Sequence, residues 1–132
     1  ERVSSRYIVA IRGTSGVADL KTNINAAMEA WIGAGRVHNG FARTMEVIAG
    51  ELEGYDGDIR ASGHPVLVLG HSLGGAASIL LTIALNEKGI DAHAINVAPP
   101  PVGDRGFEEH YKEICERLIN LFLPGEELDT AD

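Results

Sequence analysis

The chain has 132 residues, 45% of them hydrophobic, which suits one domain with a substantial core. Nineteen acidic against eleven basic residues give a net charge of −8, which disfavours nonspecific binding to nucleic acid or to anionic membranes. No stretch has the length and hydrophobicity of a membrane span, and the charged start has no signal-peptide pattern. The single cysteine, Cys115, excludes an internal disulfide, and we expect it buried in a helix. Secreted and cytoplasmic locations both stay open.

The N-terminal third of the chain predicts a strand, a helix and a loop, in that order. Residues 6–13 are rich in Ile and Val and predict a buried strand that ends at Gly13. Apolar residues then recur at helical spacing across residues 19–31, so we expect a helix there. The glycines in residues 32–41 predict a loop, with one short extended piece around Val37.

The middle third contains the most regular patterns. Residues 41–52 show helical spacing, and the glycines and proline of residues 54–65 predict a loop after it. The continuous apolar run at residues 65–70 is typical of a strand buried on both faces of a parallel sheet. Helical spacing follows over residues 72–88, with Gly89 as the C-cap.

The C-terminal third repeats the alternation of strand and helix. Residues 90–98 predict a strand that ends before three consecutive prolines, the first of which is Pro99. Residues 104–118 predict a helix, and residues 118–123 a last strand. The order predicts a single α/β domain over residues 1–132, with a three-layer sheet and parallel crossovers.

Residues 70–74, Gly-His-Ser-Leu-Gly, form the pattern G-x-S-x-G between the apolar strand and the helix. A sharp strand-to-helix turn projects a nucleophilic serine above the sheet edge and holds its backbone in a strained region. Gly70 and Gly74 suit the turn because larger side chains there would collide. The helix directs its first amides at a developing oxyanion, with the Leu73 N–H as one donor. The alternative is that Ser72 only caps the helix.

Several segments now point to a known family. In order along the chain they are "AIRGTSG", "DLKTNI", "VHNGF", "LVLGHSLGGAA" and "PPVGD". Together they resemble the class 3 lipases, α/β-hydrolases related to fungal triacylglycerol lipases, from Tyr7 to about Asn120. The resemblance implies an α/β-hydrolase core, a mostly parallel sheet with helices on both faces.

The resemblance also implies roles for individual residues. Ser72 matches the nucleophile of the family. Thr14 matches the oxyanion-hole residue that donates its amide and hydroxyl, and the Leu73 amide is the second donor. Residues 16–26 match the short lid helix that opens at a lipid interface. His38, within "VHNGF", is expected to be a packing residue.

A serine hydrolase also needs an acid and a base, in the chain order Ser, Asp, His. In the family the acid follows an R-x-x-N segment, which Arg117 and Asn120 match here, but the acid position falls on Leu123. The nearest aspartate is Asp129, which would require an insertion before it, and it is the tentative acid. The structural alternative is that Asp129 belongs to an exposed acidic tail. Other candidate acids are Glu126, Glu127 and Asp132.

The histidine of the family lies beyond that acid, and none of the five histidines of this chain does. We expect the five to be structural or surface residues: His38, His64, His71, His93 and His110. His71 adjoins the serine, but on such a turn it is expected to point elsewhere. The chain also begins inside a strand with nothing to protect its edge, so we expect the central part of a longer hydrolase whose base lies outside this sequence.

The leading hypothesis is a serine hydrolase of lipid or small carboxylic esters, acting at a lipid–water interface without cofactor or metal. The alternative is a catalytically silent lipase-like module for interaction or signalling. A nucleotide-binding domain is disfavoured, because "GHSLGG" is neither G-x-G-x-x-G nor a phosphate-binding loop. Acyl chain length, lipid class and oligomeric state are not determined by the sequence.

Overall fold

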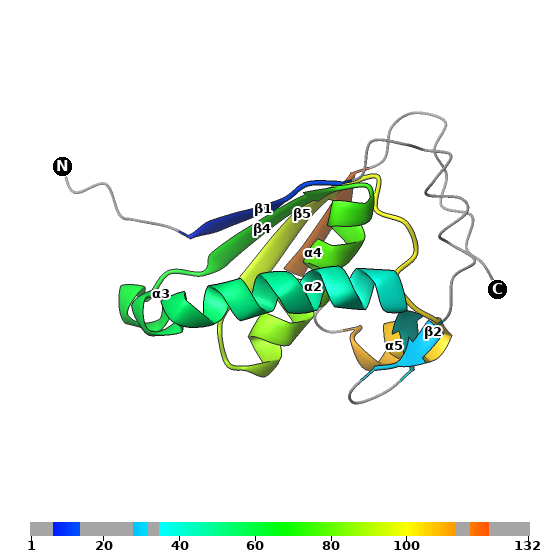
Figure 1. The fold of residues 1–132 in the computed structure, drawn as a ribbon, viewed down its shortest axis with the longest axis horizontal. Coiled ribbons are helices and arrows are strands. Elements are labelled where there is room, and N and C mark those ends of the chain that lie inside the picture. Colours follow the sequence, from blue (N-terminus) through cyan, green and yellow to red (C-terminus); the bar gives the residue numbers. More distant parts are fainter. Residues whose placement is uncertain (1–6, 14–27, 32–34, 113–116, 122–132) are drawn as a thin grey trace.

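The computed structural model describes residues 7–13, 28–31, 35–112 and 117–121. Residues 120 and 121 are described by their backbone only. Within these ranges, four parallel strands form one sheet (Figure 1). Their order across the sheet is β1 (Ile8–Ile11), β4 (Val66–His71), β5 (Ala92–Val97) and β6 (Leu118–Leu121). Because all four run in the same direction, their carboxyl ends meet at one edge.

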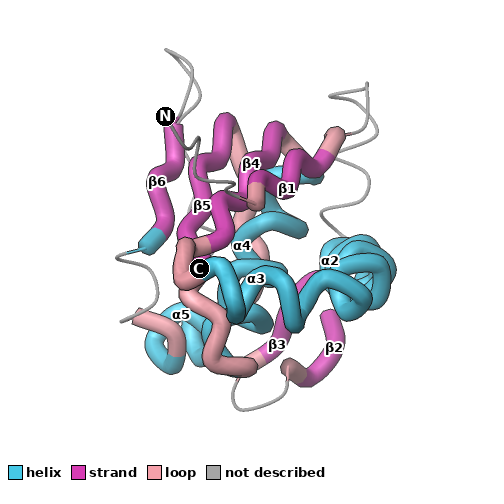
Figure 2. Tube along the Cα trace, turned by 90° about the vertical axis from the view of Figure 1, so that its left-hand side faces the viewer, coloured by secondary structure: helices cyan, strands magenta, loops and turns pink. Residues whose placement is uncertain are grey.

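Helices cover one face of this sheet. Helix α4 (Leu73–Glu87) packs directly on β4 and β5, and α2 (Asn39–Leu52) packs on α4 (Figure 2). The strand residues beneath α4 are fully buried or nearly so: Val66, Val68, Ala92, Ala94 and Asn96. Apolar packing of α4 against the two central strands is therefore the core of the domain.

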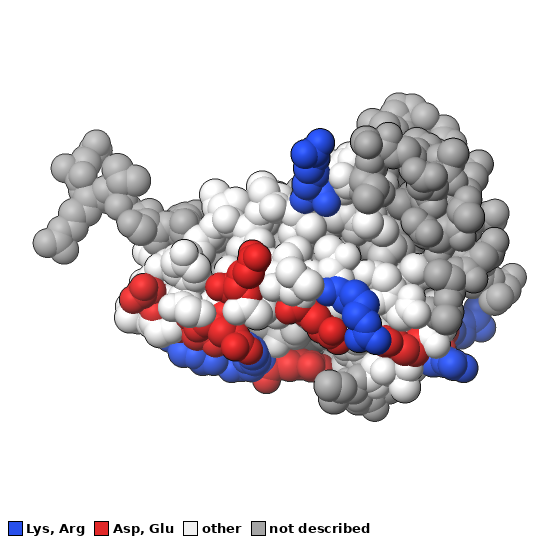
Figure 3. Space-filling model, viewed as in Figure 1, with Lys and Arg blue, Asp and Glu red and all other residues white. Residues whose placement is uncertain are grey.

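The opposite face of the sheet is less covered by the described residues. Ile8 in β1 is 61% exposed and Ile119 in β6 is 55% exposed, although the sequence predicts a buried first strand. Leu67 and Leu69 are only half-buried, so β4 is not closed on both sides as its apolar run predicts. In the part of the chain that is described, all helices lie on one side (Figures 1 and 2). Lys, Arg, Asp and Glu gather over that helical side (Figure 3).

Most predicted elements are confirmed. The α/β class, the parallel sheet, the four strands, and helices α2 and α4 lie where the patterns place them. Gly89 has φ +81 after α4, and its N–H donates to Asn86 O at 3.0 Å, as expected of a glycine that ends a helix. Helix α5 (Arg105–His110) confirms the start of the predicted helix at residues 104–118, but the chain turns at residues 111–112 and Leu118 already lies in β6.

Two predicted segments have a different secondary structure in the described residues. Met28–Ala30 is strand β2, not the end of a helix, because it pairs antiparallel with β3 (Arg36–His38). The predicted loop over residues 54–65 is mostly helical: the 3-10 helix η1 (Glu53–Tyr55) continues into α3 (Asp56–Ser62). Ile59 anchors α3 in the core, and this burial outweighs the low helix propensity of the glycines.

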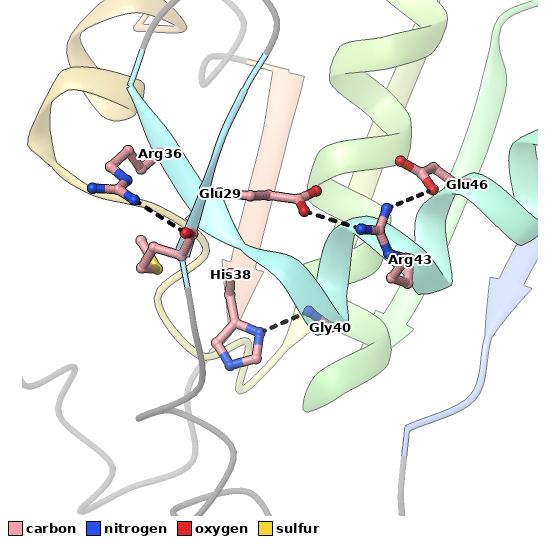
Figure 4. Close-up of polar contacts among 7 residues, drawn as sticks. Glu29, Arg36, His38, Gly40, Arg43 and Glu46 are labelled. Atoms are coloured by element: carbon pink, nitrogen blue, oxygen red, sulfur yellow. Dashed lines mark hydrogen bonds and ion pairs between the residues drawn. The ribbon is translucent and has the colours of Figure 1, made fainter.

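The hairpin of β2 and β3 is held from two sides. Arg43 of α2 pairs with Glu29 of β2 and with Glu46 of its own helix, both at 3.3 Å (Figure 4). On the other side, the Asp104 carboxylate accepts the backbone N–H groups of Arg36 and Phe107, each at 3.0 Å. The hairpin thereby joins α2 to the loop that follows β5.

Candidate active site

Ser72 lies between the last residue of β4 and the first residue of α4, at the carboxyl edge of the sheet. Its backbone has φ 55° and ψ −120°, a conformation that residues with a side chain rarely adopt. The Ser72 N–H donates to Val97 O at 2.9 Å, so the end of the neighbouring strand holds the turn. Strain of this kind costs of order 1–3 kcal/mol and persists only where the surroundings impose it.

The glycines around Ser72 are required by close backbone approach. A Cβ at Gly70 would overlap the Gly74 carbonyl, and a Cβ at Gly74 would overlap the carbonyl of Ile11 at the end of β1. A Cβ at Gly13 would overlap the His71 carbonyl. The ends of β1 and β4 and the start of α4 thus meet at the serine.

The first turn of α4 is hydrogen-bonded to the backbone of the serine. Gly75 N–H and Ala76 N–H donate to Ser72 O at 2.9 Å and 3.2 Å. The Ser72 side chain, in contrast, makes no capping hydrogen bond to the helix. The capping alternative for Ser72 therefore lacks the contact it requires, and the hydroxyl stands at the positive end of a helix of 15 residues.

The loop after β5 forms another wall of the turn. Ala98 has φ 48°, the second positive φ among the described residues other than glycine. A Cβ at Gly75 would lie 3.1 Å from Pro99 Cβ and 3.5 Å from Asn96 Cβ, so the loop packs tightly on the first turn of α4. Neither Ala98 nor Asn96 was singled out by sequence reasoning. Alanine does not by itself indicate a positive φ, so the sequence gives no sign of the strain at Ala98. Asn96 is a polar residue inside an apolar run, and this position is the sequence feature that points to it.

His38 is buried at the N-terminus of α2. Its Nδ1 accepts the Gly40 N–H at 3.2 Å, and its ring stacks on Phe41 with centroids 4.2 Å apart. His38 N–H also donates to Val102 O at 3.0 Å. The "VHNGF" segment therefore has the structural role expected of it. His38 caps α2 through its side chain, and its backbone bonds to the loop after β5.

The remaining histidines lie in several places. His64 precedes β4 and His93 is in the first half of β5, so both are near the amino edge of the sheet, opposite Ser72. His93 Nε2 lies 3.2 Å from Asp91 Oδ1, and Arg117 pairs with the same carboxylate. His110 packs edge-on against Tyr111, and His71 is exposed at the end of β4.

Two ionisable groups near α5 have shifted pKa values. Hydrogen bonds from the Arg36 and Phe107 amides lower the pKa of Asp104. Burial, together with a hydrogen bond to Glu87, raises the pKa of Tyr111 to about 12. The Tyr111 hydroxyl donates to Glu87 Oε1 and accepts from Trp31 Nε1, each at 2.8 Å. Neither group makes one of these hydrogen bonds to Ser72.

The other expected site residues lie outside the described residues. These are Thr14, the lid segment 16–26, Cys115, and the candidate acids Glu126, Glu127, Asp129 and Asp132. Gly13, which precedes Thr14, contacts the Ser72 turn. Within the described ranges, no group of three or more His, Cys, Asp or Glu side chains is arranged to hold a metal ion. No helix there reaches the length and hydrophobicity of a membrane span.

A parallel sheet whose central strand passes through a strained serine turn into a helix defines the α/β-hydrolase class. The chain belongs to the class 3 lipases, because residues 8–122 match the profile of the family described as Lipase (class 3). None of the curated proteins compared with it is a significant match.

Solved structures of fungal lipases share the fold. The nonglycosylated LIP2 lipase of Yarrowia lipolytica is 27% identical, with a TM-score of 0.72 over 85% of this chain and 43% of its own. A lipase of Rhizopus microsporus var. chinensis is 23% identical, with a TM-score of 0.66 over 91% and 45%. The triacylglyceride lipase of Rhizomucor miehei is 21% identical, with a TM-score of 0.60 over 86% and 48%. The chain spans less than half the length of each of these relatives.

Proposed function

We propose that this chain carries the nucleophile and the oxyanion hole of a serine hydrolase that cleaves carboxylic esters of lipids. The observation that supports it most strongly is the backbone of Ser72, at φ 55° and ψ −120° on the carboxyl edge of the sheet. Membership of the class 3 lipases supports hydrolase chemistry at this turn, and the titles of the similar structures name lipases.

In the proposed reaction, Ser72 Oγ attacks the acyl carbonyl and forms a tetrahedral intermediate. The Leu73 N–H, at the start of α4, donates to the developing oxyanion, where the helix dipole adds favourable potential. Thr14 supplies the second donor in this proposal, which is supported by the contact of its neighbour Gly13 with the turn.

The proton of Ser72 passes to a histidine base, which gives it to the leaving alcohol as the ester C–O bond breaks. A water molecule then attacks the acyl-serine, releases the carboxylic acid and restores Ser72. We propose no histidine of this chain for that role, since His38 caps a helix while His64 and His93 lie near the far edge of the sheet. The acid remains Asp129 in this proposal, because it is the nearest aspartate to the family's acid position, which Leu123 occupies here.

The test is hydrolysis of a p-nitrophenyl ester series, together with covalent labelling by a fluorophosphonate, for the wild type and Ser72→Ala, each in a preparation that includes the proposed histidine base. Ser62→Ala is the matched control, because the Ser62 hydroxyl bonds to Ile59 O at the end of α3. We expect labelling that Ser72→Ala abolishes and Ser62→Ala preserves. A folded wild type that labels no faster than Ser72→Ala would contradict the proposal and favour the silent interaction module.

The oxyanion hole has its own test. Loss of one such donor typically costs about 3 kcal/mol of barrier, or roughly a hundredfold in turnover. Thr14→Val should therefore lower kcat strongly in a preparation that turns over ester, with a smaller change in KM. Unchanged turnover would remove Thr14 from the mechanism.

A further inference from the structure

A buried polar pair lies directly beneath the Ser72 turn. Asn96 is in β5, opposite Gly70 of β4 in the sheet register. Ser78 is in the second turn of α4, and its hydroxyl contacts the Asn96 side-chain amide. Both residues are 0% exposed, in an interface that is built mostly from apolar side chains.

The contacts of this pair lead to the serine. The Ser78 hydroxyl has one proton, and two acceptors face it: the Asn96 amide oxygen and, at 2.9 Å, the carbonyl of Gly75. Gly75 in turn donates its N–H to Ser72 O at 2.9 Å. A continuous set of contacts therefore joins the Asn96 side chain, in β5, to the backbone of Ser72.

A polar pair at this position restricts how α4 can sit on β5 more tightly than apolar packing does. Buried hydroxyl and amide groups cost free energy unless they are paired, so the pair favours one rotation and one height of α4 on β5. Apolar side chains would tolerate small shifts of the helix. The constraint acts on the first turn of α4, where the proposed oxyanion donor Leu73 lies.

We infer that Asn96 is a positioning residue for the proposed nucleophile: through Ser78 it holds the first turn of α4, and with it Ser72 and the Leu73 N–H. This inference rests on the proposed function of Ser72. The backbone bond from Ser72 N–H to Val97 O, one residue further along β5, acts in the same direction.

The chain offers a matched control at the other end of the same helix. The Asn86 side-chain amide donates to Thr82 O at 2.8 Å and to Ala92 O at 3.0 Å, at the start of β5. Asn86→Ala therefore removes a polar link between the same helix and the same strand, far from the turn. Any effect of lower stability alone should appear in this variant too.

The experiment compares Ser78→Ala, Asn96→Ala and Asn86→Ala with the wild type, each below its melting temperature and in a preparation that includes the proposed histidine base. Labelling by a fluorophosphonate at several concentrations separates the maximal rate from the apparent affinity. We expect the maximal rate to fall about tenfold in Ser78→Ala and Asn96→Ala with the affinity unchanged, and to stay at the wild-type value in Asn86→Ala. Wild-type rates in folded Ser78→Ala and Asn96→Ala would overturn the inference.

A second readout does not depend on reactivity. Amide hydrogen exchange of Gly75 and Ala76, which donate to Ser72 O, should be about tenfold faster in Ser78→Ala and unchanged in Asn86→Ala. If the wild type does not label, the proposed function fails, and exchange alone decides whether the pair holds the turn. Equal exchange in Ser78→Ala and wild type overturns the inference. Ser78→Ala removes a single oxygen atom, so it carries the test if Asn96→Ala does not fold.

Discussion

Ser72 and Ala98 adopt left-handed backbone conformations without the freedom of glycine, at φ 55° and φ 48°. They stand where β4 and β5 end, and the Ser72 N–H bonds to the residue before Ala98. Such strain costs free energy that the surrounding packing must offset. At Ser72 the strained turn carries the proposed nucleophile, whereas at Ala98 it lies between β5 and the prolines that follow.

The strain at Ala98 leads to a prediction. Ala98→Gly should raise the free energy of unfolding by about 0.5–1 kcal/mol, because relief of the left-handed conformation outweighs the extra entropy of glycine in the unfolded chain. Urea denaturation of the two proteins measures the difference. Ala94→Gly, buried in the middle of β5, is the control and should lower stability. Equal losses in both variants would contradict the argument.

Asp104 leads to a second prediction at this scale. Its pKa is lowered in the folded state by the amide hydrogen bonds of Arg36 and Phe107. The stabilisation is therefore complete above the ordinary aspartate pKa of 3.8 and is lost as the pH falls through the lower folded pKa. Asp104→Asn should lose less stability than the wild type between neutral and acidic pH. Denaturant midpoints measured across that range give the comparison, and parallel curves would exclude the linkage.

At the scale of elements, the turn from β4 into α4 depends on what the glycines contact. A Cβ at Gly74 would overlap the end of β1, whereas a Cβ at Gly50, on the exposed side of α2, would meet nothing within 4 Å. Glycine therefore has opposite effects on stability at these two helix positions. At Gly74 it permits close approach of backbones, and at Gly50 it only lowers helix propensity.

This contrast predicts opposite effects of one substitution. Gly50→Ala should stabilise the chain by about 0.5–1 kcal/mol, the usual gain of alanine over glycine in a helix. Gly74→Ala should destabilise it by about 1–3 kcal/mol or more, because the backbone must move. Thermal melts of both variants provide the measurement. A neutral Gly74→Ala would show that β1 does not approach α4 as closely as the structure has it.

At the scale of the whole molecule, segments distant in sequence meet at Tyr111. Its hydroxyl joins Trp31, after β2, to Glu87, at the end of α4. Phe107 packs against both aromatic rings, with centroids 5.9 Å from Trp31 and 4.9 Å from Tyr111. This cluster connects the hairpin to the core.

The raised pKa of Tyr111 sets a limit to stability in alkali. The folded state holds the phenol proton up to a pKa of about 12, whereas the unfolded chain releases it near 10.0. The contribution is therefore complete below 10.0 and is lost as the pH rises to about 12. Tyr111→Phe should lose less stability than the wild type over this window, as measured by denaturant midpoints. Tyr55→Phe, at an exposed site, should behave as the wild type.

Sequence patterns were sufficient where burial has a regular period. The apolar run before Gly70 and the helical spacing after Ser72 place β4 and α4 correctly, because both elements bury one continuous apolar surface. They failed at Met28–Ala30 and at Asp56–Ser62. In the first case strand pairing with β3 overrides helical spacing, and in the second the burial of Ile59 overrides the glycines.

By itself the sequence determined the alternation of elements, the family and the serine turn, since these depend on local spacing, on the order of several short segments and on a motif of five residues. Only the tertiary structure decided that the Ser72 side chain does not cap α4 and that Gly13 packs on the turn. It also decided that Asn96 lies beneath the turn beside Ser78. The physical reason is that these contacts join different strands, and their partners are set by the sheet register rather than by neighbours in the chain.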